Sequence, residues 1–305
     1  MSPRVVAVVV NLNGGDDNVR CLRSLVGQGL EEHDIVFVDN ASSDDSVASV
    51  RAALPGVTVV ENPENVGYGE GCNQGIERAL EEGAELVFLV NNDVTFRESV
   101  LATLLEALAE RPEVGIVGPR VVYAKEPDLV WCAGGRMTWR QNLSEMIGHR
   151  RPDGPEYRVT REVDYVPGCA MLVRREVFER AGLLNAAYFA YHEDVELCLD
   201  ARAAGFPILV KGEVAAHHDA HSTTGGGYNE RRKYMMGVNT VWFLRRNGTL
   251  ARWLSFFVFD VAVLPAVWLV RALRGEGRAV RAKAIGTWDG LRGRRVTPAV
   301  LERWR

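Results

Sequence analysis

Short apolar runs alternate with longer amphipathic segments through the first 117 residues. The runs are rich in Val, Ile and Leu and have the length of buried strands; they lie at residues 5–10, 35–38, 57–60, 86–90 and 114–117. The segments between them have helical patterns, at residues 17–28, 45–54, 68–82 and 99–110. This alternation predicts an α/β fold with a mostly parallel, Rossmann-like sheet flanked by helices.

The pattern weakens after residue 120. Residues 121–163 are polar and irregular, and we expect no regular elements there. A strand is predicted at residues 169–173, followed by helices at 175–181 and 193–204. Gly182 and Gly205 follow these two helices, in the position where a glycine commonly ends a helix.

The C-terminal part begins with a long apolar segment. Residues 253–270 are almost wholly apolar, but Asp260 and Pro265 interrupt them. A helix that spans a membrane needs about 20 apolar residues. The length of this segment, its charge and its proline therefore disfavour a membrane crossing. Arg-rich residues 271–295 follow, which favours a helical extension lying on an anionic membrane. The alternative is a helical hairpin packed on the main domain or at a dimer interface.

The charge is distributed unevenly. The net charge is -4, yet residues 245–305 hold 13 Lys and Arg against 4 Asp and Glu. A basic tail on an acidic body predicts attraction to an anionic surface. The tail intersperses its Arg residues with aliphatic groups and Trp rather than with base-stacking platforms, so we expect a membrane and no nucleic acid as the partner.

The cysteines and the N-terminus favour a cytoplasmic protein. The five cysteines form no CxxC pair and have no zinc spacing, which is typical of reduced thiols. The apolar run at residues 5–10 is too short for a signal-peptide core. We therefore expect a protein located at the inner face of the cell membrane.

Three polar residues, Asn91, Asn92 and Asp93, directly follow the predicted strand at 86–90. Open α/β sheets bind ligands beyond the carboxyl ends of their strands. One carboxylate among amides suits Mg²⁺ or Mn²⁺, which complete their coordination with diphosphate oxygens and water. The alternative is a plain turn, because Asn and Asp are common turn residues.

Two other predicted strands end in polar groups at the same edge. Asn11 and Asn13 follow the first strand, and Asp39 and Asn40 follow the second. Parallel strands place their carboxyl ends together, so these residues and the triplet belong to one region. Asp39 is suited to accept hydrogen bonds from a nucleotide base or ribose. The alternative is a turn followed by a helix cap.

A glycine-rich stretch at residues 62–73 begins the third predicted helix and contains Gly67, Tyr68 and Asn73. Glycines let the backbone approach a ligand closely, and amides at a helix N-terminus favour a phosphate. The alternative is a flexible connection. No GxGxxG follows the first strand and no P-loop is present, which argues against a dinucleotide or Walker-type site.

Two further groups carry candidate chemistry. Glu193 and Asp194 begin a predicted helix, where the helix dipole favours acids; the functional alternative makes one of them a general base. Three histidines occur in the sequence His217-His218-Asp219-Ala220-His221, and a neutral imidazole among them is suited to complete a metal site near Asp93. The alternative is a surface loop with uninvolved histidines.

In their order, these segments resemble the inverting family 2 glycosyltransferases of the GT-A fold, particularly the bacterial rhamnosyltransferase-like group. The resemblance covers residues 5–222 and rests on residues 8–14, 38–44, 65–69, 91–93, 168–175 and 193–198. It implies a GT-A catalytic domain over residues 1–225 and a helical extension over 226–305. The donor-binding half would span about residues 1–120 and the acceptor half about residues 121–225.

The resemblance also implies the chemistry. The donor would be a nucleotide-diphosphate sugar, such as dTDP-rhamnose or a UDP-sugar, and the acceptor a glycan or polyprenyl-linked glycan of the cell envelope. Asp39 would contact the nucleotide, Asp93 and His217 the metal, and Asp194 would be the base, with Glu193 as second candidate. The sugar or acceptor pocket would be lined by Gly168, Cys169 and Ala170.

The sequence departs from the family pattern at three places. Amides fill the first two positions of the acidic triplet, Leu12 stands where an aromatic is common, and Val238-Asn239 replaces an expected Arg-Asn pair. The competing functions are a sugar-phosphate nucleotidyltransferase and a noncatalytic nucleotide-sugar-binding or membrane scaffold protein. The first is disfavoured because the loop after the first strand contains no Lys or Arg.

Overall fold

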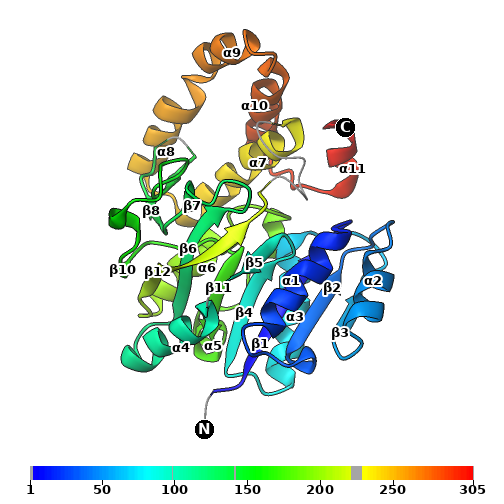
Figure 1. The fold of residues 1–305 in the computed structure, drawn as a ribbon. Coiled ribbons are helices and arrows are strands. Elements are labelled where there is room, and N and C mark those ends of the chain that lie inside the picture. The colour runs from blue at the N-terminus through cyan, green and yellow to red at the C-terminus, as the bar shows by residue number, and fades with distance from the viewer. Residues whose placement is uncertain (1–2, 98, 141, 221–228, 305) are drawn as a thin grey trace.

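The computed structural model describes residues 3–97, 99–140, 142–220 and 229–304. Its main body is a curled sheet covered by helices, and a helical extension lies beyond one end of the strands (Figure 1). The sheet has the strand order β10-β12-β6-β11-β4-β1-β2-β3, with β5 paired to β12 and β7 paired to β6. The predicted α/β sheet flanked by helices is therefore confirmed.

The first half of the sheet is parallel, as predicted. Its strands are β1 (Val5–Asn11), β2 (Ile35–Asp39), β3 (Thr58–Glu61) and β4 (Leu86–Asn91). Every residue of β1 and β2 is buried, which explains their continuous apolar runs. The register pairs Asn11 with Asp39, and Val10 with Asn91, so the polar strand ends meet at one edge.

Helices pack on this half through small residues. The elements are α1 (Asp16–Val26), α2 (Ser46–Ala53), α3 (Tyr68–Glu81) and α4 (Val100–Glu110). Helix α3 lies directly on β1, because a Cβ atom at Gly75 would lie 2.3 Å from Val8 Cγ1. Any larger residue at Gly75 would move α3, and with it the loop that precedes α3, away from the sheet.

The second half of the sheet is mixed and corrects two sequence predictions. The strand predicted at 114–117 is β6 (Ile116–Tyr123), and the supposedly irregular residues 121–163 contain short strands. These are β7 (Val130–Cys132), β8 (Gly135–Met137), β9 (Ser144–Met146) and β10 (Arg161–Glu162). Strands of two or three residues are too short for a recognisable alternation, which explains the wrong prediction.

Strand β12 (Ile208–His218) was not expected. It pairs parallel to β6 and antiparallel to β5 (Val94–Phe96), and its register shifts between Lys211 and Ala215. Such a bulge interrupts the alternation of buried and exposed side chains by which a strand is predicted. Strand β11 (Ala170–Arg174), predicted correctly, lies between β4 and β6 and is antiparallel to both.

The remaining elements are helical. Helices α5 (Arg175–Ala181) and α6 (Glu193–Ala203) follow the prediction closely, and Gly182 and Gly205 adopt the expected positive φ angles of 88° and 93°. Helix α7 (Glu230–Asn247) then leads to the C-terminal part. The domain boundary expected near residue 225, like His221 and Ser222, lies outside the described residues, and the predicted division of the chain stays a prediction.

The chain then forms an arch, defined as residues 250–291, beyond the carboxyl edge of the parallel strands (Figure 1). It rises through α8 (Leu250–Phe256), passes a π-helical turn (Phe257–Val261) and α9 (Leu264–Ala272), and returns through α10 (Gly277–Leu291). Helix α11 (Pro298–Leu301) follows. Residues Leu250–Ala272 form one helical segment of 23 residues that is long and apolar enough to cross a membrane. Of its most apolar 18-residue stretch, 11% is buried.

A buried ion pair holds the bulge of β12. Arg120 Nε, on β6, lies 3.0 Å from Asp153 Oδ1, and both side chains are under a tenth exposed. The same guanidinium donates to the carbonyl oxygen of Gly212, inside the shifted register. Since β12 continues to His217 and His218, this clamp fixes the strand that brings the histidines to the carboxyl edge.

We expect Asp153→Ala to lower the free energy of unfolding by about 3–5 kcal/mol, because it leaves the buried Arg120 charge uncompensated. Urea unfolding measures the change. The control is Asp128→Ala, which removes an exposed carboxylate in the same region. The double variant Arg120→Met/Asp153→Leu removes both charges and should recover most of the lost free energy of unfolding. Equal losses from Asp153→Ala and Asp128→Ala would contradict the role of the clamp.

Candidate active site

Asn11 joins the carboxyl ends of three strands. Its Nδ2 donates to Asp39 Oδ1 at 2.7 Å, and its Oδ1 accepts a hydrogen bond from Asn92 Nδ2 at 2.9 Å. Asn92 also donates to Asn18 Oδ1 at 2.9 Å. All four side chains are at most 4% exposed. Since buried polar groups must be hydrogen-bonded, this network fixes β1, β2 and the end of β4 relative to one another.

Gly14 makes room for this network. A Cβ atom there would lie 2.1 Å from Asn92 Nδ2 and 2.6 Å from Asn11 Oδ1. The adjoining loop is tied by side chains: Asn13 Oδ1 accepts from the backbone N–H of Ser43 at 2.7 Å, and Asn13 has a positive φ of 53°. The loop after β1 is therefore held against the loop after β2.

Asp39 is held in a fixed orientation. Its carboxylate accepts hydrogen bonds from Asn11, from the Ser42 hydroxyl at 2.6 Å and from the Ser42 backbone N–H at 2.9 Å. Ser42 Oγ itself accepts from the Asn13 backbone N–H at 2.8 Å. The sequence analysis did not single out Ser42, because serine after a strand is an ordinary turn residue.

The glycine-rich loop is attached to two neighbours. Asn40 Nδ2 donates to the carbonyl oxygen of Gly67 at 3.0 Å, and the Tyr68 hydroxyl donates to the carbonyl oxygen of Gly168 at 3.1 Å. Gly67 has a φ of 91°, and a Cβ atom there would lie 2.7 Å from Phe189 O. Gly67 is therefore required both for its backbone conformation and for the close approach of residue 189.

Asn73 has a different environment from the one expected. Its amide exchanges two hydrogen bonds with the backbone of Leu184, donating at 2.8 Å and accepting at 3.0 Å. These bonds attach α3 to the segment before α6. The expected contact between Asn73 and a donor nucleotide stays a prediction.

Asp93 faces a histidine. His218 Nε2 lies 3.2 Å from Asp93 Oδ1, and the two side chains are each 7% exposed. The edge of the Trp131 ring packs on His218, with ring centroids 4.6 Å apart. The surface-loop alternative is wrong for His217 and His218, because both lie on β12 and are buried.

The imidazole beside Asp93 is not the expected one. His217 and His218 are successive residues of β12, and successive side chains of a strand point to opposite faces of the sheet. The structure brings His218 to Asp93; a metal contact by His217 stays a prediction. Among the described residues no group of three or more His, Cys, Asp or Glu is arranged to hold a metal. A cation here would depend on Asp93, His218 and ligand oxygens, a donor set that fits Mn²⁺.

Asp194 is tied to the same edge through the segment before β11. Its Oδ2 accepts a hydrogen bond from the Gly168 backbone N–H at 2.9 Å, and its Oδ1 accepts from its neighbour Val195 at 2.8 Å. The carbonyl oxygen of Cys169 accepts from the Asn91 backbone N–H at 3.0 Å. Residues 168–170 therefore connect Asp194 to the end of β4, and Ala170 begins β11 opposite Val90.

Burial sets the protonation of this region. It raises the pKa of the Cys169 thiol well above its usual value, and the nearby charges of Cys132, Asp93 and Asp194 add to the shift. Burial also raises the pKa of the Asp194 carboxyl, against hydrogen bonds from Gly168 and Val195 that lower it. Burial therefore favours the neutral thiol of Cys169, and Asp194 has a greater affinity for a proton than an ordinary Asp.

Glu193 is more deeply buried. It is 5% exposed, and its Oε2 has no hydrogen-bond partner within the described residues. Burial raises the pKa of Glu193 well above its usual value, and the neighbouring Asp194 raises it further. The two acids therefore differ: Asp194 has backbone donors that stabilise its charge, whereas burial and the neighbouring Asp194 favour the neutral form of Glu193.

The backbone before these acids is strained. Phe189, Tyr191 and His192 have positive φ angles of 65°, 74° and 81°, which non-glycine residues rarely adopt. Asn239 of α7 holds this segment, because its Nδ2 lies 2.9, 2.7 and 3.0 Å from the carbonyl oxygens of Tyr188, Ala190 and Tyr191. Asn239, which is fully buried, therefore positions the start of α6.

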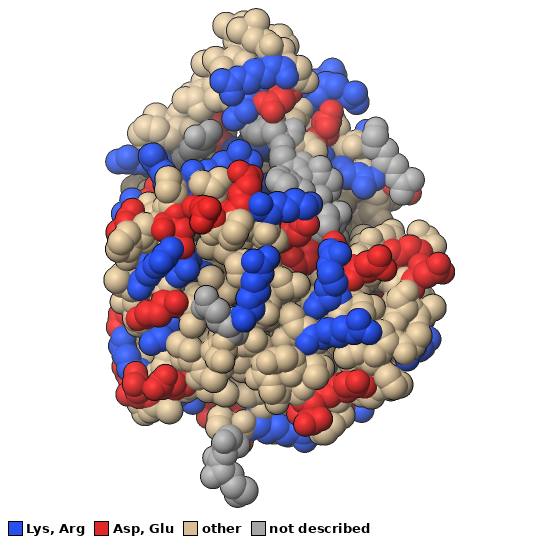
Figure 2. Space-filling model, viewed as in Figure 1, with Lys and Arg blue, Asp and Glu red and all other residues tan. Residues whose placement is uncertain are grey.

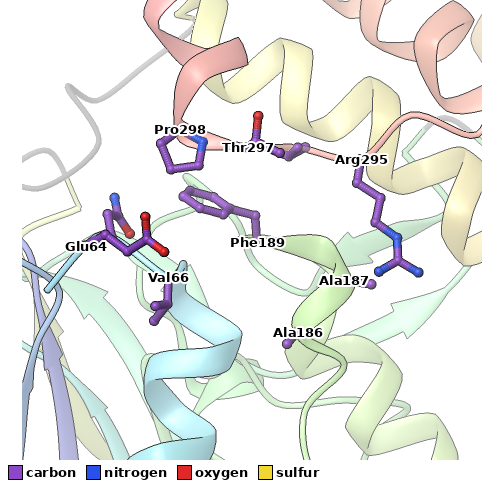
Figure 3. Close-up of a pocket in the computed structure, with 10 residues that line it drawn as sticks. Glu64, Val66, Ala186, Ala187, Phe189, Arg295, Thr297 and Pro298 are labelled. Atoms are coloured by element: carbon purple, nitrogen blue, oxygen red, sulfur yellow. The ribbon is translucent and has the colours of Figure 1, made fainter. Parts of the chain in front are cut away.

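A pocket of about 390 Å³ lies beside the glycine-rich loop (Figure 3). Glu64 and Val66 line it on the loop side, and Arg295, Thr297 and Pro298 line it from the C-terminal segment. Phe189 points between the two sides (Figure 3). The pocket is thus adjacent to the polar edge and separated from it by the strained segment.

The structure brings most of the candidate residues to one edge of the sheet. Strand ends supply Asn11, Asp39, Asn40, Asn92 and Asp93; loops supply Asn13, Gly67, Gly168 and Cys169; helix α3 supplies Tyr68, and helix α6 supplies Glu193 and Asp194. The sequence analysis missed Asn18, Ser42, His218 and Asn239 as contributors. For His218 a signal existed, because it adjoins His217, but choosing between them required the strand register.

Residues 6–182, more than half of the chain, match the family model described as Glycosyl transferase family 2. The chain is 28% identical over 244 residues to N-acetylglucosaminyl-diphospho-decaprenol L-rhamnosyltransferase of Mycobacterium tuberculosis, covering 73% of this chain and 78% of the relative.

Two solved structures have a similar fold. One is the mannosyltransferase PcManGT from Pyrobaculum calidifontis in complex with GDP-Man and Mn²⁺, with a TM-score of 0.62, 17% identity and coverage of 94% of this chain and 88% of that chain. The other is GalNAc-T7 with UDP, GalNAc and Mn²⁺, with a TM-score of 0.57, 14% identity and coverage of 78% and 51%. The predicted GT-A fold is therefore confirmed.

Glu193→Gln should change how stability depends on pH. The pKa of Glu193 is higher in the folded state than the unfolded value of about 4.3. The contribution of Glu193 to stability is therefore greatest below pH 4 and decreases as the pH rises toward the folded pKa. The variant avoids this loss, so its advantage in free energy of unfolding should grow from pH 4 to pH 8.

Urea unfolding across this pH range measures the effect. The control is Glu176→Gln on α5, an exposed carboxylate, for which we expect no comparable trend. A difference between wild type and Glu193→Gln that does not vary with pH would contradict a neutral buried Glu193.

Proposed function

Since this chain belongs to glycosyl transferase family 2 and is a glycosyltransferase, we propose that it transfers a sugar from a nucleotide-diphosphate donor to a hydroxyl group of a lipid-linked glycan, with inversion of the anomeric carbon. The observation that carries this proposal is the connection of Asp194 to the end of β4 through Gly168 and Cys169. It connects a candidate base to the strand end that precedes the Asp93 carboxylate. A nucleotidyltransferase or a noncatalytic scaffold has no comparable support.

The donor nucleotide would bind over the ends of β1 and β2. Asp39 is held there by Asn11 and Ser42, and it would present its carboxylate to the base or ribose. Asn13 and Asn40 border the same space, and Gly67 with Tyr68 would form its wall on the α3 side. For Asn73 we favour a supporting role, because both ends of its amide are bonded to Leu184.

The sugar diphosphate would lie near Asn92 and Asp93. We propose that Asp93 and His218 hold a divalent cation with the diphosphate, since the two similar solved structures contain Mn²⁺. When bound, such a cation neutralises charge on the departing diphosphate. His217 remains a second candidate for this contact, on the resemblance alone.

Asp194 would act as the base. It takes the proton of the acceptor hydroxyl as that oxygen attacks the anomeric carbon, and the bond to the diphosphate breaks on the opposite face. Its raised pKa favours accepting this proton, and its backbone hydrogen bonds fix the direction of the carboxylate. Gly168, Cys169 and Ala170 would line the sugar or acceptor pocket, while the neutral Glu193 is less suited to be the base.

The acceptor is proposed from the relatives. The rhamnosyltransferase relative is named for a decaprenol-linked diphosphate sugar. The arch gives this chain a way to approach such a lipid, because it exposes Leu250, Leu254, Leu269 and Leu273 by 57–85%. We propose that the protein associates peripherally with the inner face of the cell membrane, with dTDP-rhamnose or a UDP-sugar as donor and cell-envelope glycan as product.

Replacing Asp194 by Asn should remove nearly all turnover, by at least about 100-fold, because a general base typically contributes 10²–10⁴. Donor binding, measured by thermal shift, should persist. Two variants serve as comparison: Glu193→Gln, which tests the second candidate base, and Asp200→Asn on the same helix, whose carboxylate pairs with Arg246. Full activity of Asp194→Asn would exclude it as the base; loss of activity only in Glu193→Gln would transfer the role to Glu193.

A further inference from the structure

A pocket of about 490 Å³ lies beneath the arch. Asn142, Asp260 and Lys283 line its inner side, and α9 lines its outer side with Val263, Val267 and other apolar residues. Neither the donor site nor the base uses this pocket. It lies in the part of the molecule that stands beyond the carboxyl edge of the sheet (Figure 1).

The inner wall of the pocket is formed by a buried ion pair and its hydrogen bonds. Lys283 Nζ forms a buried ion pair with Asp260 and donates to Asn142 Oδ1 at 3.0 Å. Asp260 is 2% exposed and Lys283 is 5% exposed. Burying an ion pair is costly unless further hydrogen bonds satisfy it, and here the Asn142 side chain and backbone supply them. This wall therefore keeps a fixed shape.

The pocket is positively charged beyond this pair. Lys233 and Arg271 also line it, and Arg271 Nη1 lies 2.7 Å from Glu276 Oε2. Burial lowers the pKa of Lys233 to about 8, and the charges of Lys283, Arg232 and Arg271 lower it further, while Asp260 opposes them. Among the residues that line the pocket, the three cations Lys233, Arg271 and Lys283 outweigh the Asp260 carboxylate, and an anion placed beside Lys233 would be stabilised.

The outer wall is apolar and continues onto an exposed surface. Val263, directly before α9, lines the pocket together with Val267 and Val270 of α9, and Val270 is itself 54% exposed. The neighbouring Leu269 and Leu273 are 61% and 85% exposed. Figure 2 shows the tip of the arch as a surface without charged residues, with Lys and Arg gathered just below it. The pocket therefore has an anion-attracting side and an apolar side that leads outward.

We propose that this pocket binds one lipid phosphate: a phosphate or diphosphate beside Lys233 and Arg271, with its attached apolar chain along Val263, Val267 and Val270. Charge complementarity selects the anionic head, and the apolar wall selects a long chain over a free phosphate. The inference rests on the proposed function, because a lipid held here would present an attached sugar toward the carboxyl edge of the sheet.

Fluorescence titration of the full chain with farnesyl diphosphate tests the proposal. Lys233→Gln should weaken binding about tenfold, since it removes a charge-assisted contact. Val267→Trp should also abolish most binding, because it fills the pocket without altering charge. The controls lie outside the pocket: Arg281→Gln, an exposed cation of α10, and Leu269→Trp, an exposed residue of α9, the helix that carries Val267. Both controls should bind as the wild type does.

Competitors identify the chemistry. Farnesol and inorganic diphosphate should each compete poorly, and short-chain phosphatidylglycerol shows whether the pocket prefers a membrane phospholipid or a prenyl carrier. Equal effects of Lys233→Gln and Arg281→Gln, or full competition by inorganic diphosphate, would overturn the proposal. Thermal shift by nucleotide sugars, measured on the same variants, should stay unchanged. If nucleotide sugars caused no thermal shift in the wild type, that result would instead count against the proposed function.

Discussion

The candidate site depends on the hydrogen bonds of one side chain, Asn11. Its amide reaches the carboxylate of Asp39 on one side and Asn92 on the other, so the ends of β1, β2 and β4 are held as one unit. A buried amide can form these bonds only if all partners keep their positions. The closeness of Gly14 to this network shows how little space remains for another arrangement.

A second constraint acts on the opposite side of the pocket. The start of α6 carries two buried acids, and the backbone before it adopts conformations that three non-glycine residues disfavour. Asn239 compensates by donating to the carbonyl groups of Tyr188, Ala190 and Tyr191. Helix α7 therefore connects the C-terminal helices to the geometry of Asp194. This contact gives Asn239 a structural role at the position where the family resemblance predicted an Arg-Asn pair.

Much of the parallel half could be predicted from the sequence, because β1, β2 and β4 are buried on both faces and appear as continuous apolar runs. The convergence of Asn11, Asp39 and Asp93 followed from one rule, that parallel strands end together. The rest depended on features without a local signal. The bulge of β12 hid that strand, a one-residue difference in register decides between His217 and His218, and the strained backbone before α6 is held by Asn239, a residue about fifty positions away.

The most direct test is a thermal-shift panel of UDP-, dTDP- and GDP-sugars, each with and without Mn²⁺, on the wild type and on His218→Ala. A site formed by Asp39, Asp93 and His218 predicts stabilisation by sugars of one nucleotide, by about 2.7 kcal/mol at a hundredfold excess over Kd. The stabilisation should need Mn²⁺ and should weaken in His218→Ala. No stabilisation of the wild type by any donor would contradict the assignment of this edge as the donor site.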